Sequence, residues 1–170
     1  MLQLTKIFHF EMAHAICDYP GSCRHIHGHS YELHVTVASF ENADNYIPSP
    51  GFEIDFKEIK HVVNDSVIGS FDHKLVLSNS YLVKNPMLVS LENLVIWSEE
   101  PTAENILIYI LRTLEAVLPE KVVLSKLKLY ETKDSYAEWI RPTEQRSVDS
   151  LTKIISEEKT KKDFTFITGN

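Results

Sequence analysis

The sequence predicts an α+β fold in which two helices cover one face of an antiparallel sheet. Apolar and polar residues alternate in two early and two late segments, and two segments between them carry apolar residues at helical spacing. With 170 residues, 44% of them apolar and 24% charged, the chain suits one globular domain. Two strands, two helices and two strands in this order favour a layer of helices packed on one face of a sheet, because each element has to bury one apolar face.

The first two strands are expected over residues 2–14 and 27–37. In the first, apolar side chains recur at even positions up to Met12, although Lys6 interrupts that face. The second alternates more cleanly, and its apolar face comprises Tyr31, Leu33, Val35 and Val37. This alternation is typical of an antiparallel strand with one buried face.

Two helices follow. Asp55 is a typical N-cap, with Glu58 three residues later as its capping-box partner, and the first helix is expected to end near Gly69. Thr102 caps the second helix, which ends at Pro119 because proline cannot continue a helix.

The rest of the chain contains two more strands. Residues 74–101 show no sustained periodicity, and we expect a long loop with room for one short element. Leucine alternates with lysine over residues 126–129, which predicts the third strand, and residues 136–140 form the fourth. We predict one domain over residues 1–145, with residues 146–170 as its C-terminal extension.

Charge and composition exclude several classes of protein. A net charge of −7 argues against broad nucleic-acid binding, whereas an anionic small ligand still fits a locally basic site. Two cysteines are too few for a disulfide scaffold. The apolar runs fall short of the roughly 20 residues that cross a bilayer, and no signal-peptide pattern opens the chain. We therefore expect a cytoplasmic protein that binds neither nucleic acid nor membrane.

Four of the eight histidines lie within 16 residues, at His14, His25, His27 and His29. In an extended segment, His27 and His29 point to the same side. If the first two strands pair as a hairpin, His14 comes beside them. Three imidazoles without an obvious fourth ligand are typical of a catalytic zinc ion with an open position. The alternative is that they are ordinary surface or core histidines. We expect His25 to be exposed.

Cys23 lies four residues before His27 and has three interpretations. It could be a fourth ligand that closes a structural zinc site, or a small buried apolar residue. It could also be a thiolate beside the metal, with a pKa lowered by the cation, that acts as a base towards an acidic C–H. We interpret Cys17 as structural.

Other polar residues are candidates for a ligand pocket. Asp72 can orient the imidazole of His73 or tune its basicity, although such a pair is usually a polar loop. Glu131 occupies a position where the strand pattern expects an apolar residue, so its carboxylate needs water or a ligand with two parallel N–H donors. Thr102 and Glu104 suit a helix start, and the same position could line a pocket.

Together these motifs resemble the 6-pyruvoyltetrahydropterin synthase family. The resemblance rests on FHFEMAH and CRHIHGHSYELHVTV, followed in the same order by GFEIDFKEIK, FDHKLVL, PTAENI and KLYET. It spans residues 8–132, about three quarters of the chain. It implies the tunnelling fold, in which four-stranded sheets of three subunits join into a barrel. It also implies a homohexamer of two stacked trimers, with active sites at the subunit interfaces.

The resemblance also implies a role for each matching residue. Zn²⁺ would be bound by His14, His27 and His29. Cys23 would be the general base, and the proton relay would comprise Asp72 and His73. Glu131 would anchor the pterin ring in a pocket supported by Thr102 and Glu104.

The implied substrate is 7,8-dihydroneopterin triphosphate, and zinc would hold its side-chain oxygens and acidify the neighbouring C–H. Pyruvoyl enzymes of the family eliminate triphosphate. The bacterial 6-carboxytetrahydropterin synthases release acetaldehyde and triphosphate and feed queuosine synthesis. The C-x3-H-G-H spacing resembles the bacterial type, so we expect 6-carboxy-5,6,7,8-tetrahydropterin as the product. A pyruvoyl enzyme, a non-catalytic pterin- or metal-binding module, and another tunnelling-fold enzyme such as a cyclohydrolase or an aldolase are the alternatives.

Overall fold

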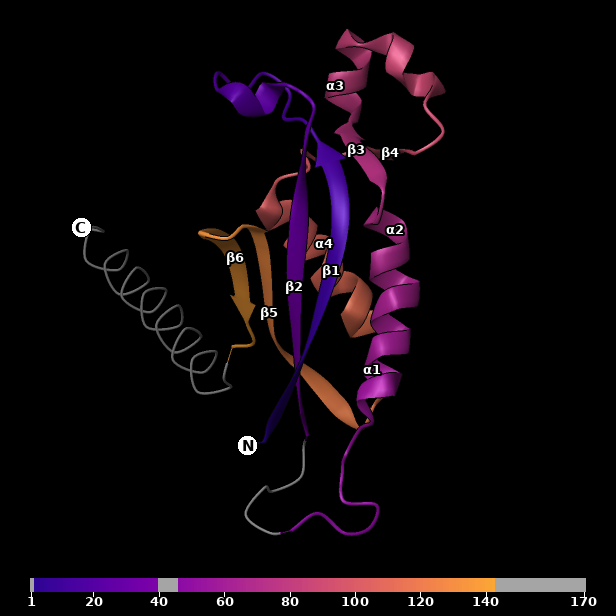
Figure 1. The fold of residues 1–170 in the computed structure, drawn as a ribbon, viewed down its shortest axis with the longest axis vertical. Coiled ribbons are helices and arrows are strands. Elements are labelled where there is room, and N and C mark those ends of the chain that lie inside the picture. Colours follow the sequence, from indigo (N-terminus) through magenta and orange to yellow (C-terminus); the bar gives the residue numbers. More distant parts are fainter. Residues whose placement is uncertain (1, 40–45, 143–170) are drawn as a thin grey trace, which may run out of the picture. The chain divides into compact units, whose positions relative to one another are not determined.

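The computed structural model describes residues 2–39 and 46–142 (Figure 1). Its main feature is a sheet with the strand order β4-β3-β1-β2-β5-β6. The six strands are β1 (Gln3–His14), β2 (His27–Ser39), β3 (Lys74–Ser78), β4 (Leu94–Trp97), β5 (Val122–Thr132) and β6 (Ser135–Ile140). The predicted α+β class and its four strands are confirmed. The prediction of a four-stranded, wholly antiparallel sheet is wrong, because β3 pairs in parallel with β1, and β4 with β3.

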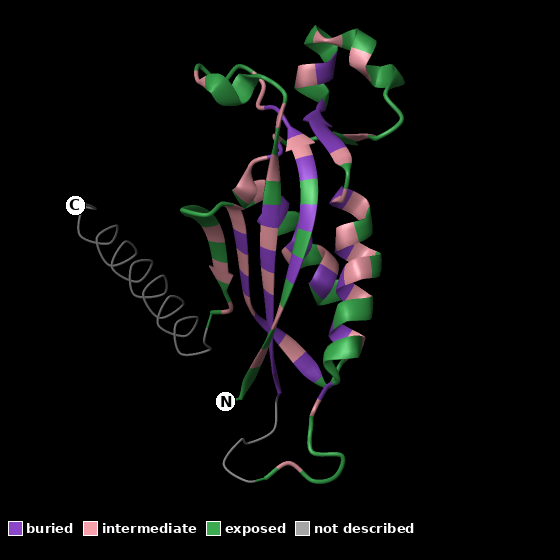
Figure 2. Ribbon diagram, viewed as in Figure 1, coloured by how far each residue is buried: buried purple, intermediate pink, exposed green. Residues whose placement is uncertain are grey.

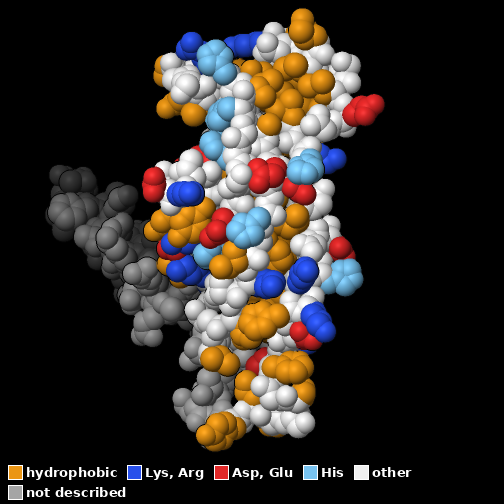
Figure 3. Space-filling view, viewed as in Figure 1, with side chains coloured by type: hydrophobic (Ala, Val, Ile, Leu, Met, Phe, Trp, Pro, Cys, Tyr) orange, Lys and Arg blue, Asp and Glu red, His pale blue; other side chains and the backbone are white. Residues whose placement is uncertain are grey.

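Residues 74–101 form regular secondary structure, where mainly a loop was expected. They comprise β3, α3 (Asn79–Lys84), η3 (Pro86–Ser90) and β4. The strands are four and five residues long, and they are continuous apolar runs rather than alternating ones. Such short runs carry no readable period, and a strand buried by parallel pairing does not need one. Apolar side chains of α3 and η3 gather on the surface at this end (Figure 3), including Val83 and Met87.

The helices cover one face of the sheet, as predicted. They are α1 (Phe56–Val63), the π-helical turn η2 (Asn64–Ile68), the short α2 (Gly69–Phe71) and α4 (Ala103–Val117). Buried residues alternate along β1, β2 and β5 (Figure 2) and form one cluster with the helices. In that cluster, Phe10 stacks between Tyr31 of β2 and Phe71 of α2, with ring centroids 5.0 and 5.7 Å apart. The core therefore lies directly beside the strand ends that carry the histidines.

The caps of both long helices are as predicted. The Asp55 carboxylate accepts a 2.8 Å hydrogen bond from the second N–H of α1, but the Glu58 carboxylate binds Lys121 instead of closing a capping box. The predicted end at Gly69 is two residues short, because the π-helical turn carries the helical path on into α2. Thr102 caps α4, which ends before Pro119.

One expectation concerns residues that the structure does not describe. The tail that follows residue 142 includes the whole of the expected extension, so that boundary stays a prediction.

Among the described helices, none is long and apolar enough to cross a membrane.

Candidate functional site

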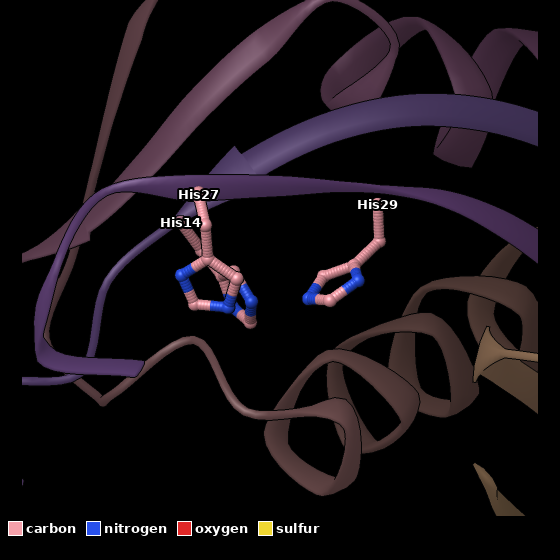
Figure 4. Close-up of side chains that lie close together, drawn as sticks. All are labelled: His14, His27 and His29. Atoms are coloured by element: carbon pink, nitrogen blue, oxygen red, sulfur yellow. The ribbon is translucent and has the colours of Figure 1, made fainter. Parts of the chain in front are cut away.

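The register of β1 and β2 brings three histidines together. His14 pairs with His27, and Met12 pairs with His29, so both β2 histidines lie beside the end of β1. A Cβ atom at Gly28, between them, would lie 3.3 Å from the Met12 carbonyl oxygen, which favours glycine there. The three rings converge on one side of the sheet (Figure 4), and their ligand nitrogens all lie within 4.8 Å of one another.

Backbone carbonyls fix the orientation of two of these rings. The Nδ1–H of His14 donates to the Pro101 carbonyl at 2.6 Å, and Nδ1–H of His27 donates to the His25 carbonyl at 2.8 Å. Because a carbonyl can only accept, each ring carries its lone pair on Nε2. The His14 Nε2 atom is buried and has no hydrogen-bond partner among the described residues. An orphaned buried nitrogen facing two further imidazoles fits a metal ion.

Burial favours the neutral form of two of these imidazoles, His14 and His29. Burial lowers the pKa of His14, and it also lowers the pKa of His29, which is less completely buried. The adjacent His27 ring lowers both pKa values further. The Glu131 carboxylate opposes these shifts without reversing them. A neutral imidazole is the form that coordinates a metal, so the donor set suits zinc.

Glu131 lies against this cluster. Its Oε1 atom is 3.5 Å from His14 Nε2 and 3.9 Å from His29 Nε2, and it accepts a 3.3 Å hydrogen bond from the Tyr31 hydroxyl. Burial, followed by the adjacent carboxylate, raises the pKa of the Tyr31 phenol, which therefore stays a donor. Glu131 is thus partly buried and has side-chain partners, and its role as a ligand anchor stays a prediction.

A pocket of about 290 Å³ opens beside the histidines. Five of the predicted site residues line it, namely His14, Cys23, Thr102, Glu104 and Glu131. The Cys23 thiol is free and exposed, in the loop between β1 and β2, and its backbone carbonyl accepts a 2.9 Å bond from Ile16. The reading of Cys23 as a buried apolar residue is therefore wrong.

Asp72 and His73 do not line this pocket. The Asp72 carboxylate accepts a 3.0 Å bond from the Glu11 N–H and lies 3.6 Å from His73 Nδ1. The His73 side chain is 80% exposed, and its φ of 59° lies in the left-handed region, which residues other than glycine adopt uncommonly. His73 borders a second pocket, which is also lined by Glu11 and Ser30, side chains that alternate to the other face of the sheet.

Sequence reasoning missed several residues around the histidines. The pocket is also lined by Tyr19, Ser135 and Tyr136. An aromatic residue within a Pro-Gly loop was the available signal for Tyr19. The Pro101 carbonyl that orients His14 gave no signal, because every residue has a carbonyl. His25 is exposed, as expected.

Comparison with known proteins decides the family. The sequence model of the family described as 6-pyruvoyl tetrahydropterin synthase matches residues 3–142. The chain belongs to this family. It is 28% identical to the 6-carboxy-5,6,7,8-tetrahydropterin synthase of Rickettsia typhi, over 81% of this chain and 99% of that one. It is 31% identical to the Synechocystis protein of the same name, over 82% and 93% of the two chains.

Solved structures share the fold. An uncharacterized protein from Wolinella succinogenes matches with a TM-score of 0.67 and 22% identity, over 83% of this chain and 98% of that one. The 6-pyruvoyl tetrahydropterin synthase of Caenorhabditis elegans matches with a TM-score of 0.60 and 20% identity, over 83% and 96%. The family predicted from the motifs is thus confirmed, and with it the expectation of an enzyme.

Proposed function

We propose that this chain is a zinc-dependent 6-carboxy-5,6,7,8-tetrahydropterin synthase of the cytoplasm. It converts 7,8-dihydroneopterin triphosphate and releases acetaldehyde and triphosphate. One observation carries the proposal: the ligand nitrogens of three imidazoles lie within 4.8 Å of one another, and one of these rings, that of His14, lines a pocket together with a free thiol and a partly buried carboxylate. The names of the relatives in Rickettsia typhi and Synechocystis support the carboxytetrahydropterin branch of the family.

The metal would be held by His14, His27 and His29 through their ring nitrogens. Bound there, zinc would supply Lewis acidity to the side-chain oxygens of the substrate. Three protein ligands would leave a coordination position open for substrate, unlike the four of a closed structural site. Burial of His14 excludes water from one side of the cluster, so that electrostatic effects within it are strong.

Cys23 is the proposed base. Its sulfur lies in the pocket without a disulfide partner, so its deprotonated form, the thiolate, could take a proton from a substrate carbon and become a thiol. A closed Cys-His₃ zinc site would leave neither this base nor an open coordination position.

Glu131 is the proposed anchor of the pterin ring. Its carboxylate can accept two parallel N–H bonds from the ring edge, and such charge-assisted pairs are strong and directional. The Tyr31 hydroxyl holds one of its oxygens in place. Thr102 and Glu104, at the start of α4, line the wall of the same pocket.

The proposed proton relay, Asp72 and His73, comes from a neighbouring subunit. Within one chain, His73 borders a different pocket from Cys23, and Asp72 lines neither of the two. A homohexamer with active sites between subunits brings the two surfaces together. The exposed, strained conformation of His73 suits a side chain that acts on a partner's site.

The turnover rates of two cysteine variants test whether Cys23 is the base. Cys23→Ala should lower the rate of acetaldehyde release by about a thousandfold or more, because the base is lost. Cys17→Ala is the matched control and should stay close to the unmodified protein, since Cys17 lies outside the pocket lining. Both variants should retain zinc. If Cys23→Ala keeps its activity, Cys23 is not the base, and if it loses zinc, Cys23 is a ligand.

A further inference from the structure

Tyr19 stands out among the residues of the pocket. It lies in the loop between β1 and β2, lines the same pocket as Cys23 and Glu131, and is 48% exposed. Within residues 2–39 and 46–142, no aromatic ring or cation stacks on its ring. A large exposed aromatic side chain at a pocket mouth has a free face for a ligand.

The position of the Tyr19 ring depends on Gly21. A Cβ atom built at Gly21 would lie 2.4 Å from Cε1 of Tyr19, so any other residue would push the ring away. The backbone at Gly21 has a φ of −90°, which any residue adopts, so the backbone itself does not require glycine. Glycine at this position therefore serves the placement of the ring.

The other tyrosine of the pocket is already engaged. The Nζ atom of Lys128 lies 3.7 Å from the centroid of the Tyr136 ring, which also packs against Tyr130 with centroids 4.9 Å apart. Tyr19 is thus the aromatic residue of the pocket lining with a face left over for a ligand.

We infer that Tyr19 is a specificity-determining residue that stacks on the pterin ring of the substrate, an inference that rests on the proposed function. Glu131 recognises the edge of the ring through in-plane hydrogen bonds, and Tyr19 recognises its face. The two contacts act at right angles, so together they fix both the position and the plane of the ring. Flat heteroaromatic ligands gain affinity from such a face without any hydrogen bond.

Binding of neopterin, a fluorescent pterin without the triphosphate, tests the inference in zinc-loaded protein. Tyr19→Leu should weaken binding by about tenfold, and Tyr19→Phe should bind within about twofold of the unmodified protein. Tyr46→Leu, a fully exposed tyrosine outside the pocket lining, is the matched control and should have no effect. In turnover, Tyr19→Leu should raise KM with little change in kcat, because stacking holds the ring and moves no proton.

Gly21→Ala provides an independent test, because it displaces the ring and leaves Tyr19 in place. It should weaken neopterin binding, and the Tyr19→Leu/Gly21→Ala double variant should bind no more weakly than Tyr19→Leu alone. If Tyr19→Leu does not fold, Gly21→Ala decides. Unchanged binding in these variants overturns the inference and leaves the proposed function intact. A failure of the unmodified protein to bind neopterin overturns both.

Discussion

The Nδ1–H of His14 donates a 2.6 Å hydrogen bond to the backbone carbonyl of Pro101. This bond joins the end of β1 to the residue that precedes the cap of α4. It turns the lone pair of Nε2 towards His27 and His29, and it places the metal-binding ring beside the helix start that carries Thr102 and Glu104. This hydrogen bond from a side chain to a backbone carbonyl therefore ties the candidate metal site to the wall of the ligand pocket.

Loss of His14 should abolish zinc binding. We expect His14→Ala to weaken zinc affinity by more than the roughly 10–100-fold that the loss of an outer partner costs, because a ligand itself is removed. Metal analysis after dialysis measures this. His9→Ala is the matched control, since His9 is an exposed β1 histidine outside the cluster. Stoichiometric zinc in His14→Ala would contradict the three-histidine site.

The metal-free protein should lose stability in mild acid. The pKa values of His14 and His29 are lowered in the fold, so below about 6.5 the unfolded chain takes up protons that the folded chain does not. Their contribution is complete above pH 6.5 and is lost as the pH falls through their folded pKa values. Urea unfolding of metal-free protein at pH 7.5 and 5.5 measures the loss. His14→Ala should reduce it, and an equal loss in both proteins would argue against the buried neutral imidazole.

Glu131→Gln should separate substrate binding from metal binding. The amide keeps the shape of the side chain but offers only one acceptor oxygen and no charge, so we expect KM to rise by about 10–100-fold. Zinc content should not change. Glu138→Gln, a β6 carboxylate paired with Lys126, controls for loss of charge. If Glu131→Gln releases zinc, the carboxylate near His14 is a metal ligand rather than the pterin anchor.

Shared active sites predict complementation between inactive variants. Cys23→Ala and His73→Ala should each be inactive, because each lacks one part of every site. After subunit exchange in an equal mixture, about one quarter of the sites should combine an intact Cys23 with an intact His73 from a neighbour. Acetaldehyde release after mixing measures the recovery. Activity that stays at the level of the separate variants would contradict a relay supplied by a neighbouring subunit.

The sequence was sufficient for those parts of the site that follow from local pattern. Alternation along β2 placed His27 and His29 on one face, and a hairpin between the first two strands placed His14 beside them. Thr102 was recognised as a cap because capping chemistry depends on a few adjacent residues.

Long-range features could not be predicted from the sequence in the same way. The parallel pairing of β3 with β1 depends on tertiary contacts, and four or five apolar residues do not reveal it. The contact of Glu131 with His14 and Tyr31 joins residues about 100 positions apart in the chain. The sequence does not show that Asp72 and His73 lie away from the pocket, because this separation depends on how the whole chain folds.

The most direct test of the proposed function is the identity of the products. Zinc-loaded protein and 7,8-dihydroneopterin triphosphate are incubated without oxygen, and the products are determined by mass spectrometry. The proposal predicts 6-carboxy-5,6,7,8-tetrahydropterin and acetaldehyde in equal amounts, both absent after zinc is removed. Formation of 6-pyruvoyltetrahydropterin, or zinc bound at the three histidines without turnover, would contradict it.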